Sequence, residues 1–162
     1  MKQISAILLA GLLALSFTAK AEDAAPADKP AENTPAKAGK FKWYTSIKEA
    51  RKAAADEKKP ILMLFTGSDW CPYCIKLEKE VLSTKEFKAW APKNAILFIA
   101  DAKGGADKLS ADNRKLMSEY GAKGFPTVVL TDAEGKKIGN TGYTGAKPAD
   151  YVKNLDGIIA KK

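Results

Sequence analysis

Trp70-Cys71-Pro72-Tyr73-Cys74 is the segment that decides how this chain is interpreted, because it holds both cysteines of the 162 residues. The apolar residues 60–65 before it are typical of a buried strand, and the residues after it are typical of a helix. Cys71 is therefore expected at the start of a helix, where backbone N–H groups and the helix dipole stabilise an anion. A thiol there ionises more readily, and the thiolate is the nucleophile of thiol–disulfide exchange.

The N-terminal residues 1–21 have the pattern of a secretory signal peptide. Lys2 is followed by an apolar run from Ile4 to Phe17, and Ala19-Lys20-Ala21 is a small-x-small cleavage pattern. We expect cleavage after Ala21, no stable membrane insertion of the mature chain, and a periplasmic or secreted location. Disulfides persist in such compartments, whereas two cysteines are too few for a disulfide scaffold. The pair is therefore interpreted as a working pair.

The charge pattern argues against nucleic-acid binding, although the formal net charge is +8. The lysines are interleaved with acids, as in residues 76–80, which is typical of a solvated surface of mixed charge. The sequence contains no histidine, which excludes His-assisted nucleophiles and His metal ligands. Zinc would need carboxylates or a dimer to complete its coordination around the two cysteines. We expect no metal and no cofactor besides the redox-active pair Cys71–Cys74.

The rest of the chain divides into a linker and one domain. Residues 22–40 are rich in Ala, Pro and charged residues and are predicted to be a disordered linker, since they have little apolar surface to bury. Residues 41–162 suffice for one core. The predicted strands are 41–44, 60–66, 95–100 and 127–131, with a hairpin at 132–138. The predicted helices are 46–57, 71–82, 83–90, 111–120 and 148–160. Helix-crossed strands pair in parallel and the hairpin is antiparallel. We therefore predict an α/β fold, a mixed central sheet with helices on both faces.

This order of elements, with Trp-Cys-x-x-Cys between strand and helix, resembles the thioredoxin fold. A second matching segment is Gly124-Phe125-Pro126-Thr127, and the hairpin signature 132–136 follows it. The resemblance covers residues 41–162 and is closest to exported bacterial thioredoxin-like proteins and to the C-terminal domain of periplasmic electron-transfer membrane reductases. It implies a cis bond before Pro126, facing the cysteines, with the backbone of Phe125 free to pair with an extended substrate. The alternative is an ordinary trans proline that opens an edge strand.

One departure from the thioredoxin pattern concerns an acid. Thioredoxins carry a buried Asp just before the Phe of the first central strand, and here Leu64 occupies that position. Glu78, one turn after Cys74, is the candidate replacement, because helical spacing puts it in one arc with apolar residues and both cysteines: Cys71, Cys74, Ile75, Val81 and Leu82. An acid there could move a proton. The alternative is a carboxylate that escapes to the rim and pairs with a lysine.

These observations lead to one main functional prediction. By the resemblance, the protein is a thiol-disulfide oxidoreductase in which Cys71 attacks and Cys74 resolves, with Trp70 and Tyr73 as an apolar rim. Its partners would be protein thiols or disulfides and a redox partner protein, with the chain a monomer. The sequence does not predict the net direction. The alternative is a non-catalytic binding module of thioredoxin fold that keeps Cys71–Cys74 as a structural staple.

Overall fold

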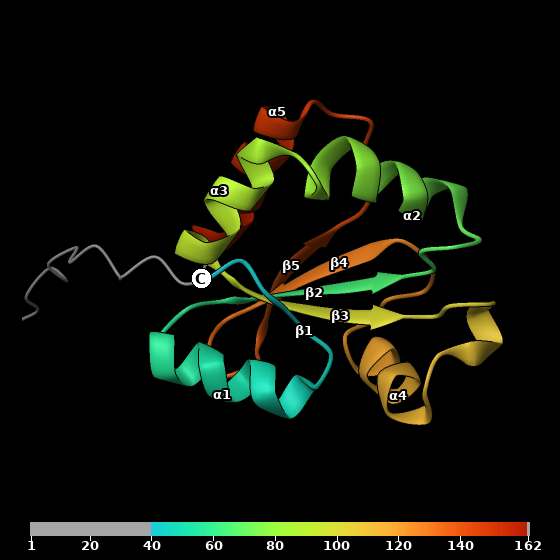
Figure 1. Cartoon of the computed structure of the whole chain (residues 1–162). Helices are drawn as coiled ribbons and strands as arrows, with labels where there is room; N and C mark the ends of the chain where they lie inside the picture. The colour runs from blue at the N-terminus through green and yellow to red at the C-terminus, as the bar shows by residue number, and fades with distance from the viewer. Residues whose placement is uncertain (1–39, 162) are drawn as a thin grey trace, which may run out of the picture. The chain divides into compact units, whose positions relative to one another are not determined.

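A five-stranded mixed sheet forms the centre of the computed structural model, which describes residues 40–161 (Figure 1). The predicted signal peptide and nearly all of the predicted linker lie outside these residues. The sheet order is β1-β3-β2-β4-β5. The strands are β1 (Trp43–Tyr44), β2 (Ile61–Thr66), β3 (Ile96–Asp101), β4 (Thr127–Thr131) and β5 (Lys137–Thr141). The first three are parallel, whereas β4 and β5 are antiparallel to their neighbours, which confirms the predicted mixed sheet.

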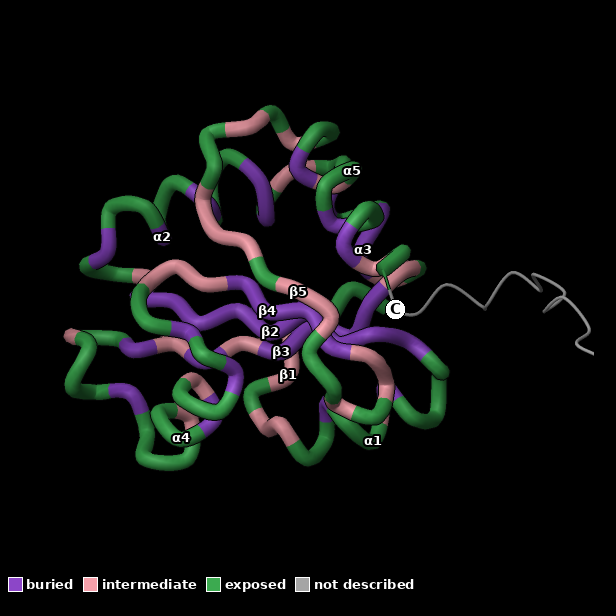
Figure 2. The backbone as a smooth tube through the Cα atoms, turned by 180° about the vertical axis from the view of Figure 1, so that it is seen from behind, coloured by how far each residue is buried: buried purple, intermediate pink, exposed green. Residues whose placement is uncertain are grey.

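Helices cover both faces of the sheet (Figure 1). One face carries α1 (Ile47–Glu57) and α4 (Ala111–Glu119), and the other carries α2 (Pro72–Leu77), α3 (Lys85–Asn94) and α5 (Pro148–Ile159). Strand β2 is buried along its whole length, as the purple tube in Figure 2 shows. Because side chains alternate along a strand, Ile61, Met63 and Phe65 pack under α1 and α4, while Leu62 and Leu64 pack under the other three helices. The core thus has two layers that share β2.

Helix α3 runs further than predicted, to Asn94 instead of Trp90, and contains Pro92. Thr84 caps its start by accepting a hydrogen bond from the Phe87 N–H (3.4 Å). Its buried residues, Phe87, Trp90 and Ala91, pack against the core, and the Trp90 indole N–H donates to Asp156 in α5 (2.6 Å). Tertiary packing therefore stabilises the helix beyond Trp90, although a proline such as Pro92 would break an isolated helix.

The helix after the cysteines also differs from the prediction. α2 ends at Leu77 and continues as a π-helical turn, η1 (Glu78–Leu82). In a π-turn the hydrogen bond joins residues five apart, whereas in an α-turn it joins residues four apart. The buried residues of the two are Cys74, Leu77, Val81 and Leu82. The predicted arc is wrong at Ile75, which is exposed. A 3₁₀ turn, η2 (Ala106–Lys108), precedes α4.

Candidate active site

The two cysteines lie where a central strand gives way to a helix. Strand β2 ends at Thr66, and Cys71 is the N-cap of α2 with an extended backbone (φ −90°, ψ 111°). Pro72 takes the first helical position, where its missing N–H is not needed. Cys71 and Cys74 are joined as a disulfide with their Cα atoms 5.2 Å apart. The pair therefore occupies the predicted place, at the first turn of the helix.

The two sulfur atoms face different neighbours. Cys74 is 2% exposed, and its Sγ accepts a hydrogen bond from the Gly67 N–H (3.4 Å). Cys71 is 5% exposed, and its Sγ lies 3.7 Å from the carbonyl oxygen of Phe125. Cys71 thus adjoins the segment that the resemblance placed opposite it, whereas Cys74 lies beneath the loop that follows β2.

Phe125 and Pro126 precede strand β4. The peptide bond between them is cis, the form that the resemblance implied. Strand β4 begins directly afterwards at Thr127, which pairs with Phe65 of β2, so the Phe125–Pro126 pair adjoins the cysteine-bearing end of β2. The structure therefore brings together Cys71 and a Phe125 carbonyl that are 54 residues apart in sequence.

Trp70 is both anchored and accessible. Its indole N–H donates to the carbonyl of Ala102 (2.7 Å), and its ring meets Phe125 edge to face at 5.7 Å, yet 40% of the residue is exposed. A Cβ at Gly67 would lie 2.5 Å from the indole, so only glycine fits beneath it. One part of the Trp70 side chain is thus packed against the protein, and the exposed part remains available for the predicted apolar rim.

Tyr73 is 60% exposed and packs against a residue that the sequence analysis missed. Its ring centroid lies 5.9 Å from that of Tyr143, in the segment between β5 and α5. The Tyr143 hydroxyl donates to Glu80 Oε2 (2.5 Å) in the π-turn. This hydrogen bond, assisted by partial desolvation and the carboxylate charge, raises the pKa of Tyr143. Nothing in the local sequence pattern points to this contact.

Hydrogen bonds between the loop after β2 and the end of β3 were also not predicted from the sequence. The backbone N–H and the hydroxyl of Ser68 donate to the two carboxylate oxygens of Asp101 (3.0 and 2.6 Å), at the end of β3. The Gly104 N–H donates to the carboxylate of Asp69 (3.0 Å). The loop that carries Gly67, and hence the donor to Cys74, is therefore fixed to the loop after β3. The only sequence feature that could have indicated this connection is Asp101, an acid directly after the buried apolar residues 95–100.

Glu78 lies at the rim, as the second of its two sequence-based alternatives had it, and not in a buried stripe. It is exposed, and its Oε1 accepts a hydrogen bond from the Ser83 hydroxyl (2.8 Å), so its partner is a serine and not a lysine. It nevertheless lines a cavity of about 340 Å³ together with Leu64 and Cys74. The other lining residues are Trp43, Thr66, Ser68, Leu77, Leu82 and Ile99. Its part in proton transfer stays a prediction.

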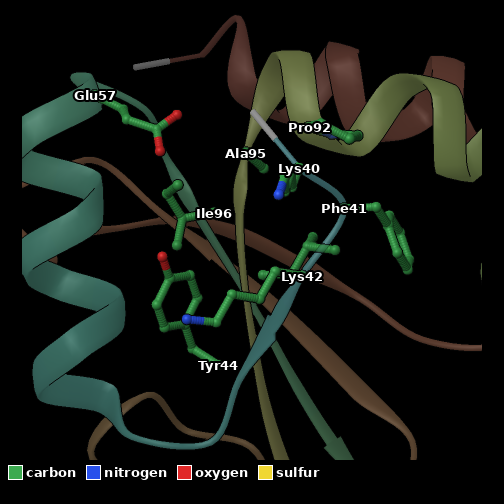
Figure 3. A pocket seen from close by; sticks show the side chains of 9 residues that line it. Lys40, Phe41, Lys42, Tyr44, Glu57, Pro92, Ala95 and Ile96 are labelled. Atoms are coloured by element: carbon green, nitrogen blue, oxygen red, sulfur yellow. The ribbon is translucent and has the colours of Figure 1, made fainter. Parts of the chain in front are cut away.

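A second hollow lies at the opposite end of the sheet (Figure 3). It is lined by Lys40, Phe41, Lys42, Tyr44, Glu57, Pro92, Ala95, Ile96 and Leu97. Figure 3 shows the Lys42 amine beside the Tyr44 ring, 4.0 Å from its centroid. Ile96 opens β3 and pairs with Ile61 at the start of β2, whereas the cysteines follow the other end of β2. This hollow is therefore separate from the two cysteines.

Neither a metal-binding cluster nor a membrane-spanning helix is found among residues 40–161. Within that range, no group of three or more His, Cys, Asp or Glu side chains is arranged to hold a metal ion. None of the helices described there is long and apolar enough to cross a bilayer.

Comparison with known proteins identifies the family. A model of the thioredoxin-like domain matches residues 47–156. The disulfide bond reductase DsbH of Chlamydia pneumoniae is 31% identical over 131 residues, covering 79% of this chain and 78% of that protein. A solved DsbH oxidoreductase gives a TM-score of 0.68 at 28% identity, covering 85% of this chain and 96% of that chain. The thiol:disulfide interchange protein DsbD of Haemophilus influenzae is 28% identical over 123 residues, which are 76% of this chain but 20% of DsbD. Since the family match takes in most of the chain, this protein belongs to the thioredoxin-like family, as a thiol-disulfide oxidoreductase.

Proposed function

We propose that this protein reduces disulfides of exported proteins, with Cys71 as the attacking and Cys74 as the resolving residue. The observation that carries the proposal is the position of Cys71 at the start of α2, with its sulfur beside the Phe125 carbonyl. The reductive direction is supported by the similarity to a protein named a disulfide bond reductase. Action outside the cytosol follows from the predicted signal peptide, residues 1–21.

The reaction requires two thiol exchanges. In the reduced protein the Cys71 thiolate attacks one sulfur of a substrate disulfide, and the other substrate sulfur leaves as a thiolate that takes up a proton. Cys74 then gives up its proton and attacks Cys71 Sγ, which releases the second substrate thiol. The substrate gains two electrons and the protein is left with the Cys71–Cys74 disulfide. A partner protein that carries a dithiol must reduce it again.

The surroundings of each sulfur suit its step. We expect the pKa of the Cys71 thiol in the reduced protein to lie below its ordinary value, because the N–H groups of the first helical turn stabilise its thiolate. The Gly67 N–H, which donates to Cys74 Sγ in the disulfide, is placed to stabilise the charge on Cys74 during resolution. The backbone of Phe125 and Pro126 can pair with an extended substrate chain, which would bring its disulfide to Cys71.

A Cys74→Ser variant tests the proposal, because it removes resolution and keeps the attacking thiol. Expressed with the native N-terminal residues, it should accumulate substrate proteins as mixed disulfides in the exported fraction. Dithiothreitol should release them. Cys71→Ser is the matched control and should capture none. Equal capture by both variants, or capture by neither, would contradict the proposal.

The staple alternative makes a different prediction for the unaltered protein. A structural disulfide should resist mild dithiothreitol, so that both cysteines stay closed to an alkylating reagent. A working pair should open and become alkylated under the same conditions. This comparison uses the wild-type chain alone, and it decides between the staple and the exchange site even where no substrate is captured.

A further inference from the structure

The segment between β5 and α5 contacts three parts of the chain near the cysteines. At Gly142 a Cβ would lie 3.0 Å from the carbonyl oxygen of Pro126, so the segment runs directly against the backbone of the cis-proline. The next residue, Tyr143, packs its ring 5.9 Å from that of Tyr73, with the planes tilted by 32°. Its hydroxyl donates to Glu80 Oε2 (2.5 Å). One short segment therefore contacts the proline loop, the dipeptide between the cysteines and the π-turn.

Two aromatic pairs involve residues next to the cysteines in the chain or in contact with Cys71. In one pair Trp70 meets Phe125 edge to face at 5.7 Å, and in the other Tyr73 packs against Tyr143. Trp70 and Tyr73 stand on either side of Cys71 in the chain and are 40% and 60% exposed. Large exposed aromatic rings of this kind are suited to apolar side chains of a bound partner. A substrate that reaches Cys71 therefore comes close to these rings.

We propose that Tyr143 determines substrate specificity, forming with Tyr73 an aromatic wall that contacts an apolar side chain next to the substrate's reacting cysteine. Glu80 is the positioning residue, because its carboxylate holds the Tyr143 hydroxyl and thereby the wall. The π-turn brings Glu80 to this place. The inference rests on the proposed exchange function of Cys71 and adds to it a substrate class: extended segments whose cysteine has apolar neighbours.

The hydrogen bond between Tyr143 and Glu80 provides a spectroscopic readout. It raises the pKa of Tyr143, so the bond is present at neutral pH and is lost as the pH rises through that raised pKa. In Glu80→Ala the pKa of Tyr143 should fall back toward the ordinary tyrosine value. Titration of the tyrosine absorbance, with Tyr143→Phe as the blank, measures the change without any substrate.

The functional test uses two peptide probes and one small disulfide. Each peptide carries a single cysteine linked to nitrothiobenzoate, with leucines beside the cysteine in one and serines in the other. Cys71 of the reduced full-length chain attacks the peptide sulfur, and nitrothiobenzoate leaves as a coloured thiolate with the electron pair. Cys74 then displaces the peptide as a thiol, and the protein becomes a disulfide. Dithiobisnitrobenzoate is the small disulfide.

We expect wild type to prefer the leucine peptide. In Tyr143→Ala the ratio of the rate constants for the leucine peptide and for dithiobisnitrobenzoate should fall by about twofold to tenfold, the range of an aromatic contact. Tyr143→Phe and Glu80→Ala should each lower the ratio by less. Their double variant should lose no more than either single one, because both remove the same hydrogen bond.

Glu134→Gln is the matched control. Glu134 is exposed in the hairpin after Thr131, which pairs with Ile61 at the end of the sheet remote from the cysteines. It should leave every rate constant unchanged. An unchanged ratio in Tyr143→Ala, or additive losses in the double variant, would overturn the inference while the exchange function stands. A wild-type protein that reacts with neither disulfide class would overturn the exchange function itself.

Discussion

Glu78 lies one turn after Cys74, yet its carboxylate is bound at the surface by the Ser83 hydroxyl. It lines the same cavity as Cys74 and Leu64, so solvent in that cavity can connect the carboxylate with the buried sulfur. An acid that is exposed in this way can accept the proton of Cys74 through water without being desolvated. The residue that fills the position of the thioredoxin acid, Leu64, cannot take a proton.

Glu78→Gln should slow the resolving step near neutral pH, because an amide cannot accept the proton that Cys74 gives up. The loss should stay below the roughly 100-fold that a directly engaged general base contributes. The measurement is the pH–rate profile for release of a mixed disulfide from Cys71. Glu86→Gln, an exposed residue in the first turn of α3, is the control. A profile identical to wild type would remove Glu78 from the mechanism.

The place of both cysteines could be predicted from local features, a strand followed by a Cys-x-x-Cys, whereas that of the Phe125–Pro126 segment was implied by the resemblance to the thioredoxin fold. Tyr143 could not, since its contacts with Tyr73 and Glu80 join three segments that no local pattern links. For Glu78 two environments could be predicted, a buried stripe or the rim, because helical spacing gives the direction of a side chain but not how far a long carboxylate reaches; in the structure it lies at the rim beside Ser83.

At the scale of elements, the strand–loop–helix unit around the cysteines depends on a neighbouring strand. The loop after β2 is fixed to Asp101, the last residue of β3, through two hydrogen bonds from Ser68. The same loop provides the Gly67 N–H that donates to Cys74 Sγ. The strands and helices were predictable from apolar runs and caps, whereas this connection depends on the pairing of Thr66 with Asp101 in the sheet.

Asp101→Ala should loosen the loop and leave the two Ser68 donors without their acceptor, at a cost of about 1–3 kcal/mol in the free energy of unfolding. It should also slow resolution by Cys74, because the Gly67 N–H loses its fixed position. Urea unfolding and the rate of mixed-disulfide release measure the two effects. With Ser68→Ala as the second arm of a double-mutant cycle, fully additive losses of stability would show that the pair does not act together.

At the scale of the whole domain, Lys59 joins helices from the two faces of the sheet at the end remote from the cysteines. Lys59 has a side chain that is only 6% exposed, and its amine lies 2.7 Å from Glu57 Oε2 in α1. The amine also donates to the carbonyl of Pro92 in α3 (2.7 Å). Helices from opposite faces are thus connected through one buried cation.

Glu57→Gln should lower the free energy of unfolding by about 1–3 kcal/mol, because it leaves the buried Lys59 amine without a countercharge. Thiol exchange should be unchanged, since the cysteines lie at the other end of β2. Asp56→Asn is the matched control: its partner Lys52 is 77% exposed, so the loss should stay below about 1 kcal/mol. Equal losses in the two variants would show that burial adds nothing to the Lys59 pair.

The two edge strands, β1 and β5, are the places where the sheet could pair with the sheet of another molecule. A β-edge recruits another chain when it offers a long, flat row of free amides and carbonyls. β1 offers only two residues. β5 begins with Lys137 and has Gly139 pressed under Ile158 of α5, where a Cβ would come within 2.7 Å. A lysine and a helix-covered glycine are poor templates for edge-to-edge stacking, so the sheet resists growing into fibrils.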